Sequence, residues 1–205
     1  NQGIREVLPD LRDISDSNAD ALIKVAVLQF SSGTQWITPA PQELDNIMWT
    51  DIEAGGVTDM GEAFTELDSK LNRHAFLADA VGNYAPVIIL MSDGEPTDDW
   101  ESGLKKLKTN KWFNAAIKIA FSIGSDANDD ILSEFTGNKE TVIPINNKDI
   151  MKKMIRFVSV TSSRIGSKKA GSSEDDVAAK QAEVAEAIQS EMEELDPEEN
   201  YNEGW

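Results

Sequence analysis

The sequence predicts an α/β domain built on a doubly wound, mostly parallel sheet with helices on both faces. Continuous apolar runs of β-forming residues alternate with segments whose apolar residues recur every three or four positions. Runs that are apolar throughout are typical of parallel strands, which are buried on both faces. Alternation of strands and helices favours right-handed crossovers, and these place helices on both sides of the sheet.

The first half of the chain predicts two helices and a pair of strands. An apolar stripe that ends at Ile14 predicts the first helix, in which Pro9 indicates a kink or a later start, and the polar residues 15–17 are typical of a loop. Residues 22–30 form an apolar run that predicts a buried strand. After a turn at 31–33, residues 34–38 predict an antiparallel edge strand. A loop that contains Gly55 and Gly56 leads into a helix from Met60 to about residue 80.

The second half predicts three more strands, each followed or preceded by a helix. The apolar segments lie at residues 87–92, 115–124 and 141–145. Helical spacing recurs between them, from Trp100 to Leu107 and around residues 131–135, and again in a closing helix over 150–158. In sheets of this kind ligands bind beyond the carboxyl ends of the strands, so the residues after Phe30, Ser92 and Gly124 are candidates for a site.

The chain divides into an α/β domain over residues 1–165 and an acidic linker and tail over 166–205. The tail begins with a Ser/Gly/Lys-rich stretch, which is typical of a linker. From Gly166 to Trp205 there are 12 acidic residues and three lysines. A narrow apolar stripe indicates a short helix at 175–195, and two interpretations remain open: a solvated acidic tail, or a helix that docks on a partner.

The formal net charge of −18 argues against nucleic acid as a partner, because affinity for phosphates rests on clustered Lys and Arg. No apolar run approaches the roughly 20 residues that cross a bilayer. There is no cysteine, hence no disulfide or thiolate metal site, and the N-terminus has no signal-peptide pattern. These features favour a cytoplasmic protein with neither a membrane span nor a nucleic-acid partner.

Two segments carry a candidate metal site. The strand at 87–92 ends in Asp93, and the Gly-Gly turn before Thr58 allows the backbone to bring a hydroxyl close to that carboxylate. Hard divalent cations such as Mg²⁺ prefer oxygen ligands of these kinds. Further acidic residues, which either line the rim of the site or belong to a solvated acidic loop, are Asp59, Glu95 and Asp98.

The segments 55–64 and 88–100 resemble the von Willebrand factor A (VWA) family, a Rossmann-like fold, and within it the bacterial TerY-like group associated with tellurite-resistance and stress operons. Residues 119–128 and 135–137 match later segments of the family, and the resemblance covers residues 1 to 162. It implies that Thr58 is the loop ligand of a metal-ion-dependent adhesion site (MIDAS). It also implies that Asp93 is the distal carboxylate and that the cofactor is Mg²⁺ or another divalent cation.

The sequence departs from the family in one respect. Family members begin with a central strand that ends in Asp-x-Ser-x-Ser, and no such motif stands upstream of Thr58. The domain at 1–165 is therefore expected to be N-terminally incomplete, and metal binding is conditional on that segment. We expect the strand either to belong to residues upstream or to come from a second chain.

The resemblance implies a non-enzymatic, metal-dependent protein-binding module whose partner presents an acidic side chain to the metal. It implies a scaffold or adaptor role in a bacterial stress or defence system. Two alternatives are a metal-assisted phosphohydrolase or nuclease and a metal-independent structural subunit of a larger assembly. No catalytic residue is assigned: the chain has no nucleophile elbow or phosphate-binding glycine loop, and His74, its one histidine, cannot build a His-based triad.

Overall fold

The computed structural model describes residues 1–17, 23–53, 55–78, 86–166 and 174–195. In chain order the elements are α1 (Gln2–Ser17), β1 (Lys24–Val25), β2 (Leu28–Ser31), β3 (Gly33–Trp36), β4 (Gln42–Glu43), η1 (Leu44–Asn46), α2 (Met60–Lys70), β5 (Val87–Ser92), α3 (Trp100–Leu107), α4 (Lys111–Ala115), β6 (Ile117–Ile123), α5 (Asp129–Thr136), η2 (Lys139–Thr141), β7 (Val142–Ile145), α6 (Lys148–Gly166) and α7 (Glu174–Glu194).

The centre of the molecule is a parallel three-stranded sheet in the order β5-β6-β7. Strand β6 pairs on both sides, and Ala120 lies opposite Leu90 on one neighbour and Val142 on the other. Because side chains alternate along a strand, β6 contributes to two cores. Ile119 and Phe121 enter one of them and Ala120 enters the other.

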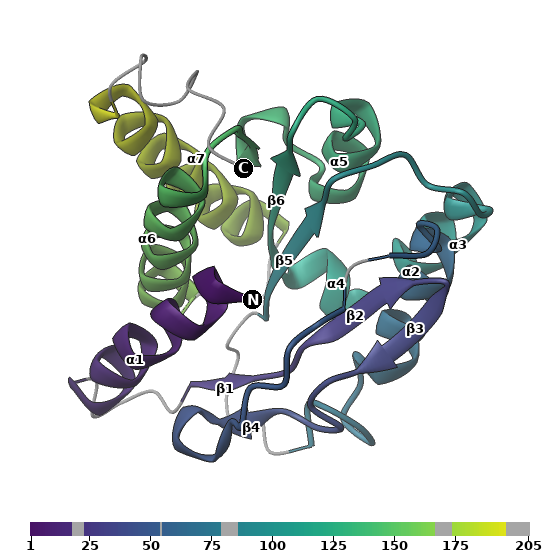
Figure 1. Cartoon of the computed structure of the whole chain (residues 1–205), viewed down its shortest axis with the longest axis horizontal. Coiled ribbons are helices and arrows are strands. Elements are labelled where there is room, and N and C mark those ends of the chain that lie inside the picture. The colour runs from purple at the N-terminus through teal and green to yellow at the C-terminus, as the bar shows by residue number, and fades with distance from the viewer. Residues whose placement is uncertain (18–22, 54, 79–85, 167–173, 196–205) are drawn as a thin grey trace.

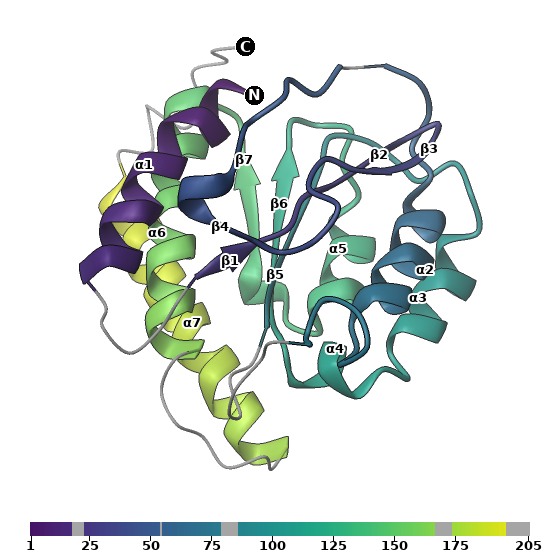
Figure 2. The ribbon, with the colours of Figure 1, turned by 90° about the horizontal axis from the view of Figure 1, so that it is seen from below.

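Helices cover both faces of this sheet, as Figures 1 and 2 show. On one face α1, α6 and α7 pack with their apolar stripes on the strands, through residues such as Val7, Met154 and Val184. On the other face α2, α3, α4 and α5 enclose a cluster that includes the ring stack of Phe64 on Phe135, with centroids 5.6 Å apart. The predicted α/β architecture with a parallel sheet and helices on both faces is confirmed at this level.

The predicted single sheet is divided. The antiparallel pairs β2-β3 and β1-β4 lie on the side of β5 away from β6 (Figure 1), and within the described ranges neither is hydrogen-bonded to β5. The strand that is paired on both sides is more buried than the strand that is paired on one side. Most of β6 is buried, whereas in β5 only Leu90 and Ser92 are buried and the other four residues are half-buried. The outer edge of β5 and the four half-buried residues of β2 are therefore incompletely covered.

Helices α2 and α3 approach so closely that glycine is required at the contact. A Cβ on Gly103 would lie 2.4 Å from the carbonyl oxygen of Gly61, and a Cβ on Gly61 would lie 2.5 Å from the carbonyl oxygen of Asp99. These contacts are with backbone, which cannot move aside independently of its helix. The pair of glycines thus fixes the distance between the two helices that flank the candidate site.

Helix α7 packs on the domain through Val184, Ala185 and Ile188, which are at most 3% exposed. Gln181 joins it to the sheet: its Oε1 accepts from the backbone N–H of Lys118 at 3.0 Å, and its Nε2 donates to the Lys118 carbonyl at 2.6 Å. Nε2 also lies 3.1 Å from Oγ1 of Thr141. Since β7 pairs with β6 only from Ala120 onward, the Gln181 amide takes the place of a strand residue beside Lys118.

Several predicted boundaries were wrong. Residues 15–17 continue α1 rather than forming a loop, because a polar final turn is tolerated where the preceding turns are held by packing. The predicted strand at 22–30 is two short strands, and its first residue lies outside the described residues. Helix α2 ends at Lys70, ten residues early. The predicted strand at 115–124 begins at Ile117, because the short helix α4, which has one buried side chain, precedes it.

Candidate functional site

The two predicted ligands lie at the carboxyl edge of the parallel sheet. Asp93 directly follows β5, and its side chain is exposed. Thr58 precedes α2, and its Oγ1 lies 3.6 Å from the position that a Cβ on Gly94 would take. The hydroxyl of Thr58 is therefore beside the backbone of the residue after Asp93, so the structure brings both to one edge.

The loop of Thr58 is held in place by its backbone. Its N–H donates to Oγ1 of Thr97 at 3.0 Å, and its carbonyl accepts from the N–H of Thr97 at 2.9 Å. Gly56 has φ +88° and packs so closely on Ser32 that a Cβ would lie 2.6 Å from the serine Oγ. Both the positive φ and the close contact with Ser32 exclude a side chain at Gly56. The glycine turn is therefore required to place the Thr58 hydroxyl.

Asp59 joins this loop to the β2-β3 turn. Its Oδ2 accepts from the N–H of Gly33 at 2.7 Å, and its own N–H donates to the carbonyl of Ser31 at 3.0 Å. Thr58 and Asp59 thus link the carboxyl end of β2 to the carboxyl end of β5.

Asp98 caps helix α2 from a neighbouring loop. Its two carboxylate oxygens accept from the backbone N–H groups of Gly61 at 2.9 Å and Glu62 at 2.8 Å. The next residue, Asp99, caps α3 through a bond from the N–H of Ser102 at 3.2 Å. Hydrogen bonds from the side chain and the backbone of Ser102 hold the pKa of Asp99 below its ordinary value. Both aspartates satisfy amides at helix N-termini, which have no partner within their own helix.

Glu95 points toward the loop that follows β6. Its two oxygens accept from Nδ2 of Asn128 at 2.9 and 3.1 Å, and Oδ1 of Asn128 caps α5. All three predicted rim residues, Asp59, Glu95 and Asp98, accept hydrogen bonds from other residues of the chain. Thr97 and Asn128 hold these loops together, but neither was identified from the sequence. The only local signal was that they follow the strands β5 and β6, whose carboxyl ends are where a ligand site is expected.

Thr58 and Asp93 do not belong to a larger cluster of metal-binding side chains among the described residues. Across the five described ranges, no group of three or more His, Cys, Asp or Glu side chains lies close enough to hold a metal ion. Thr58 supplies one hydroxyl oxygen and Asp93 one free carboxylate, which suit a hard cation in kind.

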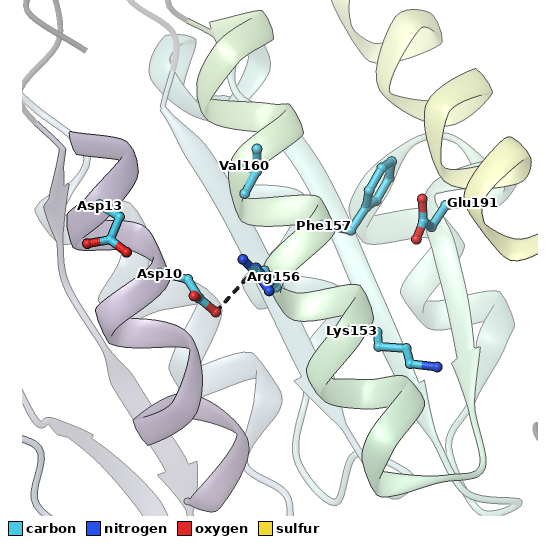
Figure 3. A pocket seen from close by; sticks show the side chains of 7 residues that line it. All are labelled: Asp10, Asp13, Lys153, Arg156, Phe157, Val160 and Glu191. Carbon is cyan, nitrogen blue, oxygen red and sulfur yellow. Dashed lines mark ion pairs between the residues drawn. The ribbon is translucent and has the colours of Figure 1, made fainter. Parts of the chain in front are cut away.

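A separate hollow of about 490 Å³ lies between α1, α6 and α7 (Figure 3). Phe157 and Val160 line it beside charged side chains, and Asp10 and Arg156 pair across it at 3.2 Å. These opposite charges offset one another, and neither Thr58 nor Asp93 lines the hollow. It carries no site.

Comparison with known proteins identifies the fold. No family model and no curated protein matches the sequence, but solved structures do. Proximal thread matrix protein 1 from the mussel byssus, in a form with a zinc-occupied MIDAS motif, matches with TM-score 0.56 and 19% identity over 79% of this chain and 42% of its own. A von Willebrand factor type A structure from Catenulispora acidiphila matches with TM-score 0.53 and 15% identity over 78% of this chain and 38% of its own.

This chain therefore has the fold of a VWA-type α/β domain. It spans less than half the length of the solved chains that it resembles. Among the helices that the structure describes, none is both long and apolar enough to cross a membrane.

Proposed function

We propose that this chain is a metal-ion-dependent protein-binding module. Thr58 and Asp93 would hold a divalent cation, Mg²⁺ or another, at the carboxyl edge of the sheet. The bound cation supplies an open coordination position, and an acidic side chain from a protein partner completes it. The observation that carries this proposal is the convergence of the Thr58 hydroxyl and the free Asp93 carboxylate at that edge. A structural neighbour with zinc in its MIDAS motif supports it.

The proposal further includes a strand between β2 and β5. Both strands end at the Thr58–Asp59 loop, and both have half-buried apolar residues that one more strand would cover. An apolar strand in this position would end beside Thr58, where its following residues could add the missing oxygen ligands. We propose that an extended apolar segment, from upstream residues or from a second chain, completes both the sheet and the site.

Two more specific parts of the proposal rest only on the resemblance of the sequence to the VWA family. One is a TerY-like scaffold or adaptor role in a bacterial stress or defence system, in the cytoplasm. The other is the absence of catalysis. Hydrolysis of a generic phosphomonoester or phosphodiester by the pure protein, abolished in Asp93→Ala, would show that the module is instead a metal-assisted hydrolase.

The proposal can be tested with a synthetic peptide, an apolar strand ending in Asp-x-Ser-x-Ser, added to the full chain. We expect the peptide to raise the melting temperature and to create Mg²⁺ or Mn²⁺ binding measurable by calorimetry. Asp93→Ala and Thr58→Ala should remove metal binding and leave peptide binding intact. Asp130→Ala, an exposed aspartate on α5, is the matched control and should change neither. Metal binding that survives Asp93→Ala, or a peptide that does not bind, would contradict the proposal.

A further inference from the structure

One part of this acidic protein is cationic. From Ser102 to Ser125 the chain has five lysines and no acidic residue, although the whole chain has a net charge of −18. The fifth of these, Lys118, is directed inward: it is largely buried, burial lowers its pKa, and its Nζ donates to the carbonyls of Phe113 and Ala116. The other four, Lys105, Lys106, Lys108 and Lys111, are exposed.

These lysines lie at the C-terminal end of α3 and at the start of α4, next to the aromatic ring of Trp112. Trp112 is half-buried in α4, and the guanidinium of Arg73 lies 5.3 Å from its ring centroid while Nζ of Lys111 lies 5.8 Å from it. Such contacts hold cationic groups over an aromatic face. We define the lysine surface as Lys105, Lys106, Lys108, Lys111, Arg73 and Trp112.

The lysine surface lies at the opposite end of the sheet from the candidate metal site. Helix α4 leads directly into the first residue of β6, whereas Asp93 follows the last residue of β5, which is parallel to β6. In Figures 1 and 2, α4 lies at the ends of these strands away from their arrowheads. A ligand of one surface therefore does not touch the other.

The charges on this surface are only partly compensated. Lys106 pairs with the half-buried Asp68 at 3.6 Å. Lys108 pairs with Glu134 at 3.3 Å, and this second pair is exposed, so it contributes little and exchanges readily. Within the described ranges, neither Lys105 nor Lys111 has a carboxylate within ion-pair distance. Lys105 and Lys111, the second of which lies beside the Trp112 ring, are therefore suited to bind an anionic group.

We propose that the lysine surface binds a short acidic peptide segment of a partner protein. The Debye length is about 8 Å at physiological ionic strength, so the charges nearest to a bound segment, those of the lysine surface together with Asp68 and Glu134, act on it most strongly. A nucleic acid would extend beyond the surface, over the remaining residues, which carry a net charge of −23 once the four lysines and Arg73 are set apart. The negative charge outside the surface thus favours a short peptide over a nucleic acid.

The test is fluorescence anisotropy with a labelled Glu-rich peptide of neutral termini, added to the full chain. We expect binding that weakens as salt rises and is unchanged by EDTA or by Asp93→Ala, so that failure here is distinct from failure of the metal-dependent function. In the double variant Lys105→Gln/Lys111→Gln, affinity should fall about fivefold, since each exposed ion pair contributes about 1.5- to 5-fold.

The matched control is Lys139→Gln/Lys148→Gln, which removes two exposed lysines outside this surface. It should lower affinity less than about twofold, since these lysines lie outside the binding surface and act only through long-range charge. Circular dichroism checks that both variants fold. Three results would each overturn the proposal: no binding at low salt, equal losses in the two double variants, or equal affinity for a labelled single-stranded oligonucleotide.

Discussion

Replacing Gly103 with alanine tests whether the close approach of α2 and α3 is required. The added Cβ would lie 2.4 Å from the Gly61 carbonyl oxygen and 2.9 Å from its Cα. Real Cβ atoms do not come that close to backbone, so the two helices must separate. Because the loops of Thr58 and Asp98 are attached to these helices, separation would also move the candidate site.

The magnitude follows from two opposing effects. Overpacking of a well-packed contact costs about 1–3 kcal/mol, while alanine is preferred over glycine inside a helix by up to about 1 kcal/mol. The net expectation is a loss of about 1–2 kcal/mol of unfolding free energy. For a domain of this size that lowers the melting temperature by about 2–8 °C.

Urea unfolding followed by circular dichroism measures this loss, with Gly3→Ala as the control. Gly3 is also helical, but the nearest atom to its added Cβ is the flexible Met151 Cε at 3.3 Å. Gly3→Ala should therefore leave stability unchanged or raise it slightly. If Gly103→Ala is as stable as the original chain, the α2–α3 contact is not as close as described here.

Three further changes test other contacts. Asp98→Ala should destabilise the protein by about 1 kcal/mol, because two N-terminal amides of α2 lose their acceptor, and Asp98→Asn should recover part of this in urea unfolding. Gln181→Ala should cost about 1–3 kcal/mol by leaving the Lys118 amide and carbonyl unpaired; Gln189→Ala, exposed on the same helix, should cost almost nothing, and equal losses would refute this role. Since the folded-state pKa of Asp99 is lowered, its contribution to stability is present above its unfolded pKa and is lost as pH falls through the folded value. Asp99→Asn should remove that part of the acid sensitivity, as measured by melting temperature against pH.

The sequence predicted elements whose signal is local. The β5 strand was found because five apolar residues and a serine precede an Asp-Gly pair, and α3 because its apolar residues recur at helical spacing. The same logic placed Thr58 and Asp93 at the carboxyl edge. The position of Thr58 relative to Asp93 depends on Thr97, whose hydroxyl and amide bind the backbone of Thr58, 39 residues away. No local sequence pattern indicates that Thr58 and Thr97 pair.

The roles of individual acidic residues were the hardest feature to predict from the sequence. Asp98 looks like one carboxylate of an acidic loop, yet its partners are amides 36 and 37 residues distant, on a helix that begins in another part of the chain. Gln181 binds Lys118 across 63 residues. Such contacts form only when distant helices and strands pack together. The periodicity of the sequence predicts each helix or strand by itself and not how they pack.

The two edges of the parallel sheet differ in how they resist association between copies. In β7 an exposed Pro144 interrupts the edge and removes a hydrogen-bond donor. The outer edge of β5 has six consecutive residues without proline, glycine or charge, which is the kind of edge that recruits strands from other molecules and leads to aggregation. The net charge of −18 keeps copies apart at low ionic strength. Colloidal stability should thus fall as salt is added, and occupation of the β5 edge by a cognate strand should restore it.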